Sequence, residues 1–377
     1  MENNSFFWNM YHDYVIKRLK NLVSENRAYY RTDLHIHSKY SSDGQDHLIE
    51  KIERAKAYQF DIMSVTDHDA VGIYDELYQL YAEKKEYVDN SPVIIPGVEY
   101  TVYYEKYYGL CHLLQYFIDP KSDSVMRNLK INERAFWNRS RIQFDRIHKN
   151  YALQKICKDY NIEITYEGYK DFLKKSNEKT PGYNSLVDYI FDHFIEKGIG
   201  VNPVKDLVYE MVCSDTCIDR REKYLEALKR FEKRHKNEEI EQKGYLLLPL
   251  LAPVGIDDHD FHGDALGILT VNKYGQIDLG DLKGSGFYIL AHPEVEQLDL
   301  LETDIPRNYN QIVAYEINKS NYRSTMDDIK KEAAKVGYFF TVGSDSHSVS
   351  DSLYESIEFY NYPQNQLRYL IEKGEQR

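Results

Sequence analysis

Histidine and carboxylate residues recur along the chain beside short apolar segments. The candidates are His35, His37, Asp43, Asp67, His68, Glu99, His112, His292, Asp345 and His347. Two residues spaced i, i+2 on a strand point to the same face, so His35 with His37, and Asp345 with His347, can each act as a pair. Imidazoles with a few carboxylates suit Zn²⁺, Mn²⁺ or Fe²⁺ better than Ca²⁺ or Mg²⁺. The pattern therefore predicts a transition-metal centre.

The candidates outnumber the ligands that one tetrahedral ion uses. A carboxylate such as Glu99 can bridge two ions, which favours a polynuclear site. Close-set metal ions hydrolyse phosphate esters well, because they activate water, hold phosphate oxygens and stabilise the leaving oxygen. A single histidine after a strand is more often an ordinary core residue, but so many beside acidic or small residues favour the metal centre.

The elements that must position these side chains alternate between strands and helices. The predicted strands cover residues 31–36, 60–66, 93–102, 110–118, 287–291, 312–317 and 338–343. The predicted helices cover residues 46–59, 73–88, 324–336 and 364–374. This alternation predicts a parallel α/β sheet or barrel, in which the carboxyl ends of the strands meet at one mouth.

Four parts of the chain are expected to have separate roles. Residues 1–27 form an N-terminal helix, with helical apolar spacing over 6–23, that packs on the main body. Residues 28–120 and 284–377 form the two parts of the barrel. Residues 121–283 are a mainly helical insertion or cap. This insertion holds equal numbers of basic and acidic residues, so the formal charge of −13 lies in the flanks.

Composition narrows the classes of protein. No apolar run approaches the ~18 residues that a membrane helix needs, and no export signal is visible. Four scattered cysteines do not make a disulfide scaffold. The negative charge argues against a general nucleic-acid coat protein. We expect a cytoplasmic protein with reduced thiols and no membrane partner.

Basic residues gather at the start of the insertion. Arg134, Arg139 and Arg141 lie in a predicted helix and are candidate phosphate ligands, since guanidinium binds phosphate well; a solvated helix face is the alternative. Residues 220–236 form a second basic helix, either solvated or contacting a partner or nucleic acid. Residues 255–264 contain two histidines among four aspartates and are interpreted as an ordinary polar loop rather than another metal site.

Five segments, in this order, resemble motifs of the PHP (polymerase and histidinol phosphatase) superfamily of metal-dependent phosphoesterases. They are DLHIHSKYSSDG, SVTDHD, IPGVEY, LAHPE and VGSDSH, within residues 30–120 and 284–350. The resemblance implies an α/β fold, a distorted (β/α)7 barrel here interrupted by a large, mainly helical insertion. It also implies a trinuclear site that holds two or three divalent ions of manganese, zinc or iron.

The resemblance assigns ligands by motif. The first ion would be held by His35, His37, Glu99 and Asp345. The second would be held by Glu99, His112 and His292. The third would be held by Asp43, His68 and His347. Asp67 would act in catalysis by orienting a neighbouring ligand rather than by binding metal itself.

Within the superfamily, the motifs are most similar to the nucleotide and oligonucleotide phosphoesterase branch. The leading hypothesis is a hydrolase of nucleotides or short single-stranded oligonucleotides, in which a hydroxide bridging two metal ions attacks phosphorus. The alternative is a nuclease effector of a bacterial defence system, working with a separate ATPase, and the insertion could contact such a protein partner. A histidinol phosphatase and a structural metal-binding subunit are less favoured.

Overall fold

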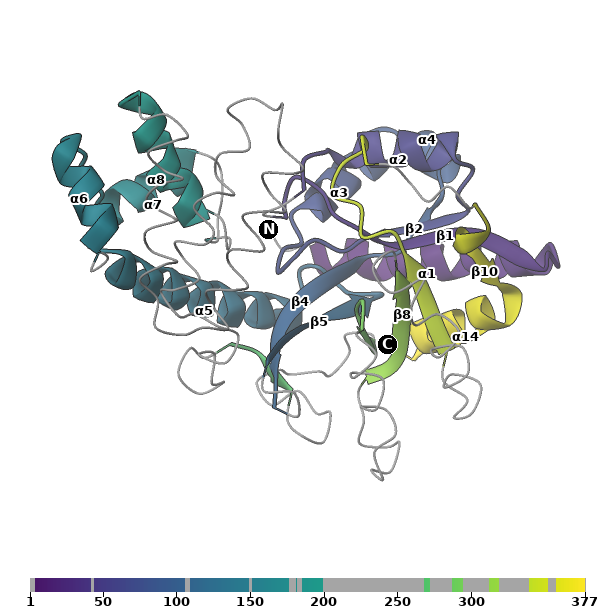
Figure 1. The fold of residues 1–377 in the computed structure, drawn as a ribbon. Helices are drawn as coiled ribbons and strands as arrows, with labels where there is room; N and C mark the ends of the chain where they lie inside the picture. The colour runs from purple at the N-terminus through teal and green to yellow at the C-terminus, as the bar shows by residue number, and fades with distance from the viewer. Residues whose placement is uncertain are drawn as a thin grey trace. The chain divides into compact units, whose positions relative to one another are not determined.

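The protein is described by a computed structural model (Figure 1). The described residues are 4–41, 44–105, 109–148, 151–175, 181, 185–198, 268–271, 287–293, 312–318, 339–351 and 357–376. The chain forms two compact units, one of residues 1–132 with 267–377 and the other of residues 133–266. The domain boundaries expected from the sequence stay predictions, because much of 121–283 lies outside the described residues.

The strands of the first unit form two sheets. The smaller has the order β10–β1–β2–β3, formed by Asn361–Pro363, Tyr29–Ile36, Ile62–Val65 and Val93–Ile94. The larger has the order β6–β4–β5–β7–β8–β9, formed by Thr270–Val271, Gly97–Tyr104, Gly109–Tyr116, Phe287–Leu290, Ile312–Asn318 and Phe339–Gly343. Apolar side chains of both sheets belong to one continuous core.

Strand β5 runs antiparallel to both of its neighbours, β4 and β7. The expectation of a purely parallel sheet is therefore wrong at this strand. The reason lies in the connection: Tyr104 pairs with Gly109, and so short a link joins antiparallel strands, whereas a parallel pair needs a long crossover. The pairs β1–β2, β2–β3, β7–β8 and β8–β9 are parallel, as expected.

Two isolated parallel bridges connect the sheets. Ile36, at the end of β1, pairs with Ser346 beyond β9, and His68, beyond β2, pairs with Glu99 on β4. Backbone hydrogen bonds reinforce the first contact, since Asp345 N–H donates to the His35 carbonyl over 2.8 Å. The fold is mixed α/β with two linked sheets; the closed seven-stranded barrel stays a prediction.

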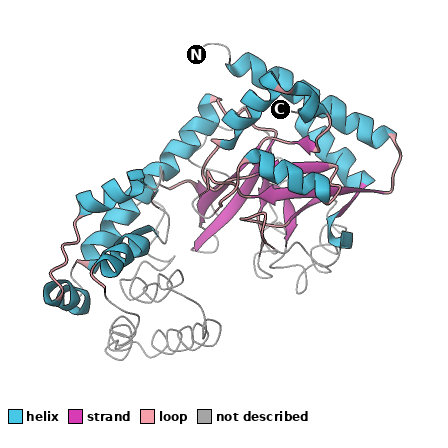
Figure 2. Ribbon diagram, turned by 90° about the horizontal axis from the view of Figure 1, so that it is seen from above, coloured by secondary structure: helices cyan, strands magenta, loops and turns pink. Residues whose placement is uncertain are grey.

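Helices of the first unit lie beside these strands (Figure 2). They are α1 (Asn4–Ser24), α2 (Leu48–Ala57), α3 (Ile73–Glu83), α4 (Lys85–Asp89) and α14 (Gln364–Glu375), with a 3-10 turn at Ile357–Tyr360. The predicted helix over 73–88 is broken at Lys84, whose backbone is not helical. Helix α1 packs against α14 and buries Trp8, Tyr11 and Leu19, as its apolar spacing predicts. The predicted helix over 324–336 lies outside the described residues.

The described part of the second unit is helical. Its helices are the later turns of α5 (Asp123–Ile147), then α6 (Tyr151–Asp159), α7 (Tyr166–Lys175) and α8 (Ser185–Glu196). Tyr169, Leu173 and Phe194 are buried, and the rings of Tyr169 and Tyr189 lie 5.6 Å apart. Across the described parts of both units, no helix combines the length and apolar character that crossing a membrane requires.

Candidate metal centre

Six strands of the first unit supply side chains to one cluster, or are followed directly by residues that do. His35 lies near the carboxyl end of β1, and His37 follows that strand. His68 lies in the segment after β2. Glu99 and His112 lie within the antiparallel pair β4–β5, where Glu99 pairs with Leu114 and Thr101 with His112. This register places both side chains on the same face. The remaining members are His292 after β7 and Asp345 and His347 after β9.

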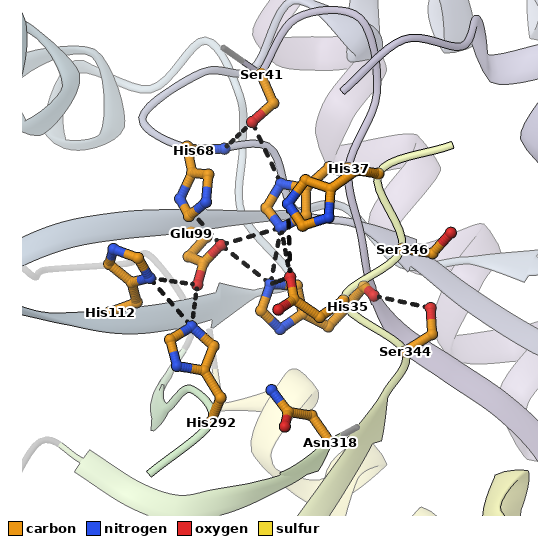
Figure 3. Close-up of polar contacts among 12 residues, drawn as sticks. His35, His37, Ser41, His68, Glu99, His112, His292, Asn318, Ser344 and Ser346 are labelled. Atoms are coloured by element: carbon orange, nitrogen blue, oxygen red, sulfur yellow. Dashed lines mark hydrogen bonds and ion pairs between the residues drawn. The ribbon is translucent and has the colours of Figure 1, made fainter. Parts of the chain in front are cut away.

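Glu99 lies at the centre of the cluster (Figure 3). Its two carboxylate oxygens face different imidazoles. Oε2 lies 3.0 Å from His35 Nε2, 3.3 Å from His37 Nε2 and 3.1 Å from His68 Nδ1, and Oε1 lies 3.1 Å from His112 Nδ1 and 3.3 Å from His292 Nε2. A carboxylate with a separate set of imidazoles at each oxygen has the geometry of a bridging ligand.

Asp345 supplies a second carboxylate oxygen. Its Oδ1 lies 3.1 Å from His37 Nε2, 3.5 Å from His35 Nε2 and 3.9 Å from His347 Nε2. Asp345 and His292 both have positive φ angles, 54° and 28°. Side chains rarely tolerate this backbone conformation, which is found where the surroundings enforce it, often at functional sites.

The separations of these donor atoms fit metal coordination. Two ligands of a tetrahedral ion with bonds of 2.0–2.1 Å lie about 3.4 Å apart. Three groups have donor atoms that all lie within 4.8 Å of one another: His37 with His68 and His347, His35 with His37 and Glu99, and His68 with Glu99 and His112. The nitrogen and oxygen donors present are those that zinc, manganese and iron use.

Burial divides the cluster into two halves. We call His35, His37 and Glu99 the inner half, because their side chains have no exposed surface. The outer half comprises His68, His112, His292, Asp345 and His347, whose side chains are between 20% and 34% exposed. The inner half is shielded from water, whereas the outer half is accessible to a ligand in solution.

The electrostatics of Glu99 and His37 favour metal ligation, whereas burial of His35 is outweighed by the charges of Glu316 and Glu99, which hold its pKa well above the usual value. Burial alone would raise the pKa of Glu99, but the charges of His35, His68 and His112 outweigh it and hold that pKa well below its usual range. Burial, together with the nearby His68, lowers the pKa of His37 to about 4. Glu99 is therefore an ionised acceptor and His37 a neutral imidazole at pH 7, which are the forms that bind metal.

Asp67 is buried and contacts the segment that follows His37. Its carboxylate accepts hydrogen bonds from Ser38 N–H, over 2.5 Å, and from the Ser38 hydroxyl, over 2.7 Å. Its backbone carbonyl accepts the N–H of Glu99 over 3.2 Å. These contacts connect the loops after β1 and β2 to strand β4, which suits an orienting role.

Several supporting residues were not predicted from the sequence. Glu316 on β8 is buried, and its Oε1 lies 2.8 Å from His35 Nδ1. Arg54 on α2 donates to Ser346 Oγ over 2.9 Å and to the carbonyls of Ser348 and Asp351. The one available signal for Glu316 was a carboxylate within the apolar segment IVAYEIN, since a fully buried acid requires a partner.

The predicted phosphate-binding arginines lie on α5, in the second unit. Arg134 and Arg141 are exposed. Arg139 is buried: its Nη2 donates to the Pro181 carbonyl over 3.3 Å, and its guanidinium lies 4.8 Å from the centre of the Phe136 ring. Exposed guanidinium groups suit phosphate binding, and a buried one that contacts protein does not.

Other predicted features lie outside the described residues. These are Asp43, the basic segment 220–236 and the loop 255–264 with His259 and His262.

Comparison with known proteins gives one family match. The family model of the PHP domain matches residues 33–202. A search of curated proteins found no match. Among solved structures, one similar chain, from Bifidobacterium adolescentis, is described as an inferred metal-dependent phosphoesterase; the two are 16% identical, with a TM-score of 0.51 over 91% of this chain and 96% of that one. Identity this low establishes likeness of fold only.

An amidohydrolase from Chromobacterium violaceum, solved with sulfate and no metal, is 18% identical over 90% of this chain and 96% of that one. Its TM-score is 0.43.

Proposed function

We propose that the chain hydrolyses phosphate esters with the help of divalent metal ions, a function that the match of the PHP-domain family model to residues 33–202 supports. One observation carries the proposal: the two oxygens of Glu99 face two separate sets of imidazoles at 3.0–3.3 Å. A carboxylate between two sets of nitrogen donors can bridge two ions, which suits a hydrolytic site with several ions better than a structural site for one ion.

We assign two or three ions of manganese, zinc or iron to this centre. The first ion would be held by His35, His37, Glu99 and Asp345. The second would be held by Glu99, His112 and His292. The third would be held by His68 and His347, with Asp43 as its further ligand by motif. Bound divalent ions supply positive charge for the phosphate oxygens and for the leaving oxygen.

The chain's own residues supply negative charge, hold a loop in place and provide access for the substrate. Glu99 and Asp345 hold negative charge between the imidazoles, and Asp67 fixes the loop that follows His37 through two hydrogen bonds to Ser38. The partly exposed imidazoles, such as His112 and His347, lie where a phosphate ester from solution can reach them. Positioning of this kind accounts for much of the catalysis in phosphoryl transfer.

For the substrate we propose a nucleotide or a short single-stranded oligonucleotide. The exposed arginines Arg134 and Arg141 support this class, because guanidinium groups bind phosphate in a bidentate manner. Arg139 is not included, since its guanidinium contacts Pro181 and Phe136.

The test uses Mn²⁺-loaded protein and three substrates: a nucleoside monophosphate, a nucleoside bisphosphate and a short 5′-phosphorylated single-stranded oligonucleotide. We expect EDTA to abolish hydrolysis and Mn²⁺ to restore it. Release of inorganic phosphate indicates a monoesterase, whereas shortened oligonucleotides indicate a nuclease. Glu53→Gln, an exposed carboxylate change on α2, is the matched control and should retain activity. Absence of hydrolysis of all three substrates would contradict the proposal.

A further inference from the structure

We propose that Glu316 is a positioning residue that holds two metal-ligand histidines from different strands, an inference that rests on the proposed function. Its carboxylate is completely buried on β8, opposite Thr341 of β9. Oε1 lies 2.8 Å from His35 Nδ1, and Oε2 accepts the backbone N–H of His292 over 2.9 Å. One side chain thus contacts a residue of β1 and a residue after β7.

The first contact decides which nitrogen of His35 is available to a metal. An ionised carboxylate accepts hydrogen bonds but cannot donate one. The proton between His35 Nδ1 and an ionised Glu316 is therefore carried by His35 Nδ1. In the neutral ring, which is the form that a metal ion binds, the other nitrogen, Nε2, then presents a lone pair. That atom lies 3.0 Å from Glu99 Oε2 and 3.1 Å from His37 Nε2, at the centre of the inner half. Glu316 therefore selects the tautomer that can ligate.

The second contact holds the backbone of His292. This residue has a φ angle of 28°, a conformation that L-residues seldom adopt without support. The hydrogen bond from its N–H to Glu316 supplies such support and fixes the point at which the chain leaves β7. His292 Nε2 then reaches Glu99 Oε1, 3.3 Å away.

The packing leaves no room for the carboxylate to move toward β9. A Cβ atom at Gly343 would lie 2.3 Å from Glu316 Oε1 and 2.3 Å from His35 Cβ. Glycine at this position therefore allows β9 to approach the Glu316–His35 pair closely. Asn318, two residues along β8, adds a further donor to Oε2 over 3.4 Å. The carboxylate is thus held in place from three sides.

Glu316→Gln separates positioning from packing, because the two side chains have the same shape. An amide has one acceptor oxygen, and its NH₂ group can only donate. If the NH₂ faces His292 N–H, two donors meet. If it faces His35 Nδ1, that nitrogen must accept, and the ring proton moves to Nε2, where it occupies the metal-binding lone pair. Either arrangement disturbs one of the two histidines.

The experiment is a Mn²⁺ titration of metal-free wild-type and variant proteins by calorimetry, with the melting temperature of each metal-free protein measured in parallel. We expect Glu316→Gln to melt within a few degrees of wild type and to bind Mn²⁺ about 10–100-fold more weakly. Thr341→Val, an isosteric change opposite Glu316 in the same buried layer, is the matched control and should bind Mn²⁺ within about twofold of wild type.

The outcomes distinguish the two proposals. A folded Glu316→Gln protein with wild-type Mn²⁺ affinity would overturn the positioning role and leave the proposed function intact. A wild-type protein that binds no Mn²⁺ would overturn the proposed function and this inference with it. If Glu316→Gln does not fold, NMR of Zn²⁺-loaded wild type with ¹⁵N-labelled histidine decides: we expect a proton on His35 Nδ1, assigned through its loss in His35→Gln, and a proton on Nε2 would overturn the role.

Discussion

The inner and outer halves of the metal centre differ in burial and in what holds them. In the inner half, His35, His37 and Glu99 are shielded from solvent, and a second layer of buried acid, Glu316, contacts His35. In the outer half, His347 lies in the loop after β9 and its side chain is about one-third exposed. The inner half is therefore closed to solvent, and the outer half is the part of the cluster that a ligand from solution can reach.

The largest expected effect comes from Glu99, which contacts both halves. Glu99→Gln replaces an acceptor that faces five imidazoles by a neutral amide. We expect phosphate-ester hydrolysis to fall by about 10³-fold or more, equivalent to ~4 kcal/mol of transition-state stabilisation. Steady-state kinetics at saturating Mn²⁺, with metal content measured on the same sample, would test this. Near wild-type activity would mean that the two halves do not work through this carboxylate.

The next prediction compares the two halves by the free energy of unfolding, which His35→Ala should lower much more than His347→Ala. His35→Ala leaves the buried Glu99 and Glu316 without a shared partner, and breaking a buried charged pair in this way costs about 3–5 kcal/mol. His347 is partly exposed, and its removal should change the free energy of unfolding by less than about 1 kcal/mol. Urea denaturation of the metal-free proteins measures both values. Equal losses would remove the distinction between the halves.

A smaller effect is expected at Arg54, which supports the outer half. It donates to Ser346, Ser348 and Asp351, in the loop that carries Asp345 and His347. Arg54→Ala should lower kcat/KM by about 3–10-fold, equivalent to ~1 kcal/mol, the contribution of a typical hydrogen bond.

The control for Arg54 is Lys56→Ala on the same helix. Lys56 contacts Glu53 and the ring of Tyr87, away from the loop after β9. Its change should leave kcat/KM within about twofold of wild type, because exposed ion pairs contribute little. A matching loss in both variants would indicate a general weakening of α2 rather than release of the loop.

An effect of similar size, confined to one substrate, is expected for substrate choice. The double change Arg134→Ala and Arg141→Ala should raise the KM for a 5′-phosphorylated oligonucleotide about 3–10-fold and leave the KM for a nucleoside monophosphate unchanged. Arg127→Ala, earlier on the same helix, serves as the comparison. If both substrates respond alike, or neither does, the arginines have no part in selecting a longer substrate.

Local spacing made much of the candidate site predictable. The pairs His35–His37 and Asp345–His347 are two residues apart, and such spacing on or beside a strand is visible in the sequence. Most strands that carry the cluster were predicted within a few residues of their observed bounds, because short apolar segments separated by helices are a strong local signal. The predicted strand over 93–102 is the exception: it is two strands, β3 and β4, which belong to different sheets.

The unpredicted features depend on distant contacts. Glu316 and His35 are separated by 281 positions, and nothing near either residue indicates the other. The antiparallel direction of β5 was also not predicted, because side-chain alternation is the same whichever way a strand runs. Strand β10 has three residues and is defined by its pairing with β1 rather than by its own composition.

The bridge between Ile36 and Ser346, with the hydrogen bond from Asp345 N–H to the His35 carbonyl, has a consequence for biosynthesis. At the usual synthesis rate of about 5–20 residues per second, the codons for these partners are translated some 15–60 s apart. During that interval His35 and His37 already exist, but neither Asp345 nor the strand beside them does. The candidate metal centre can therefore be completed only after Asp345 and His347 have been synthesised, long after His35 and His37.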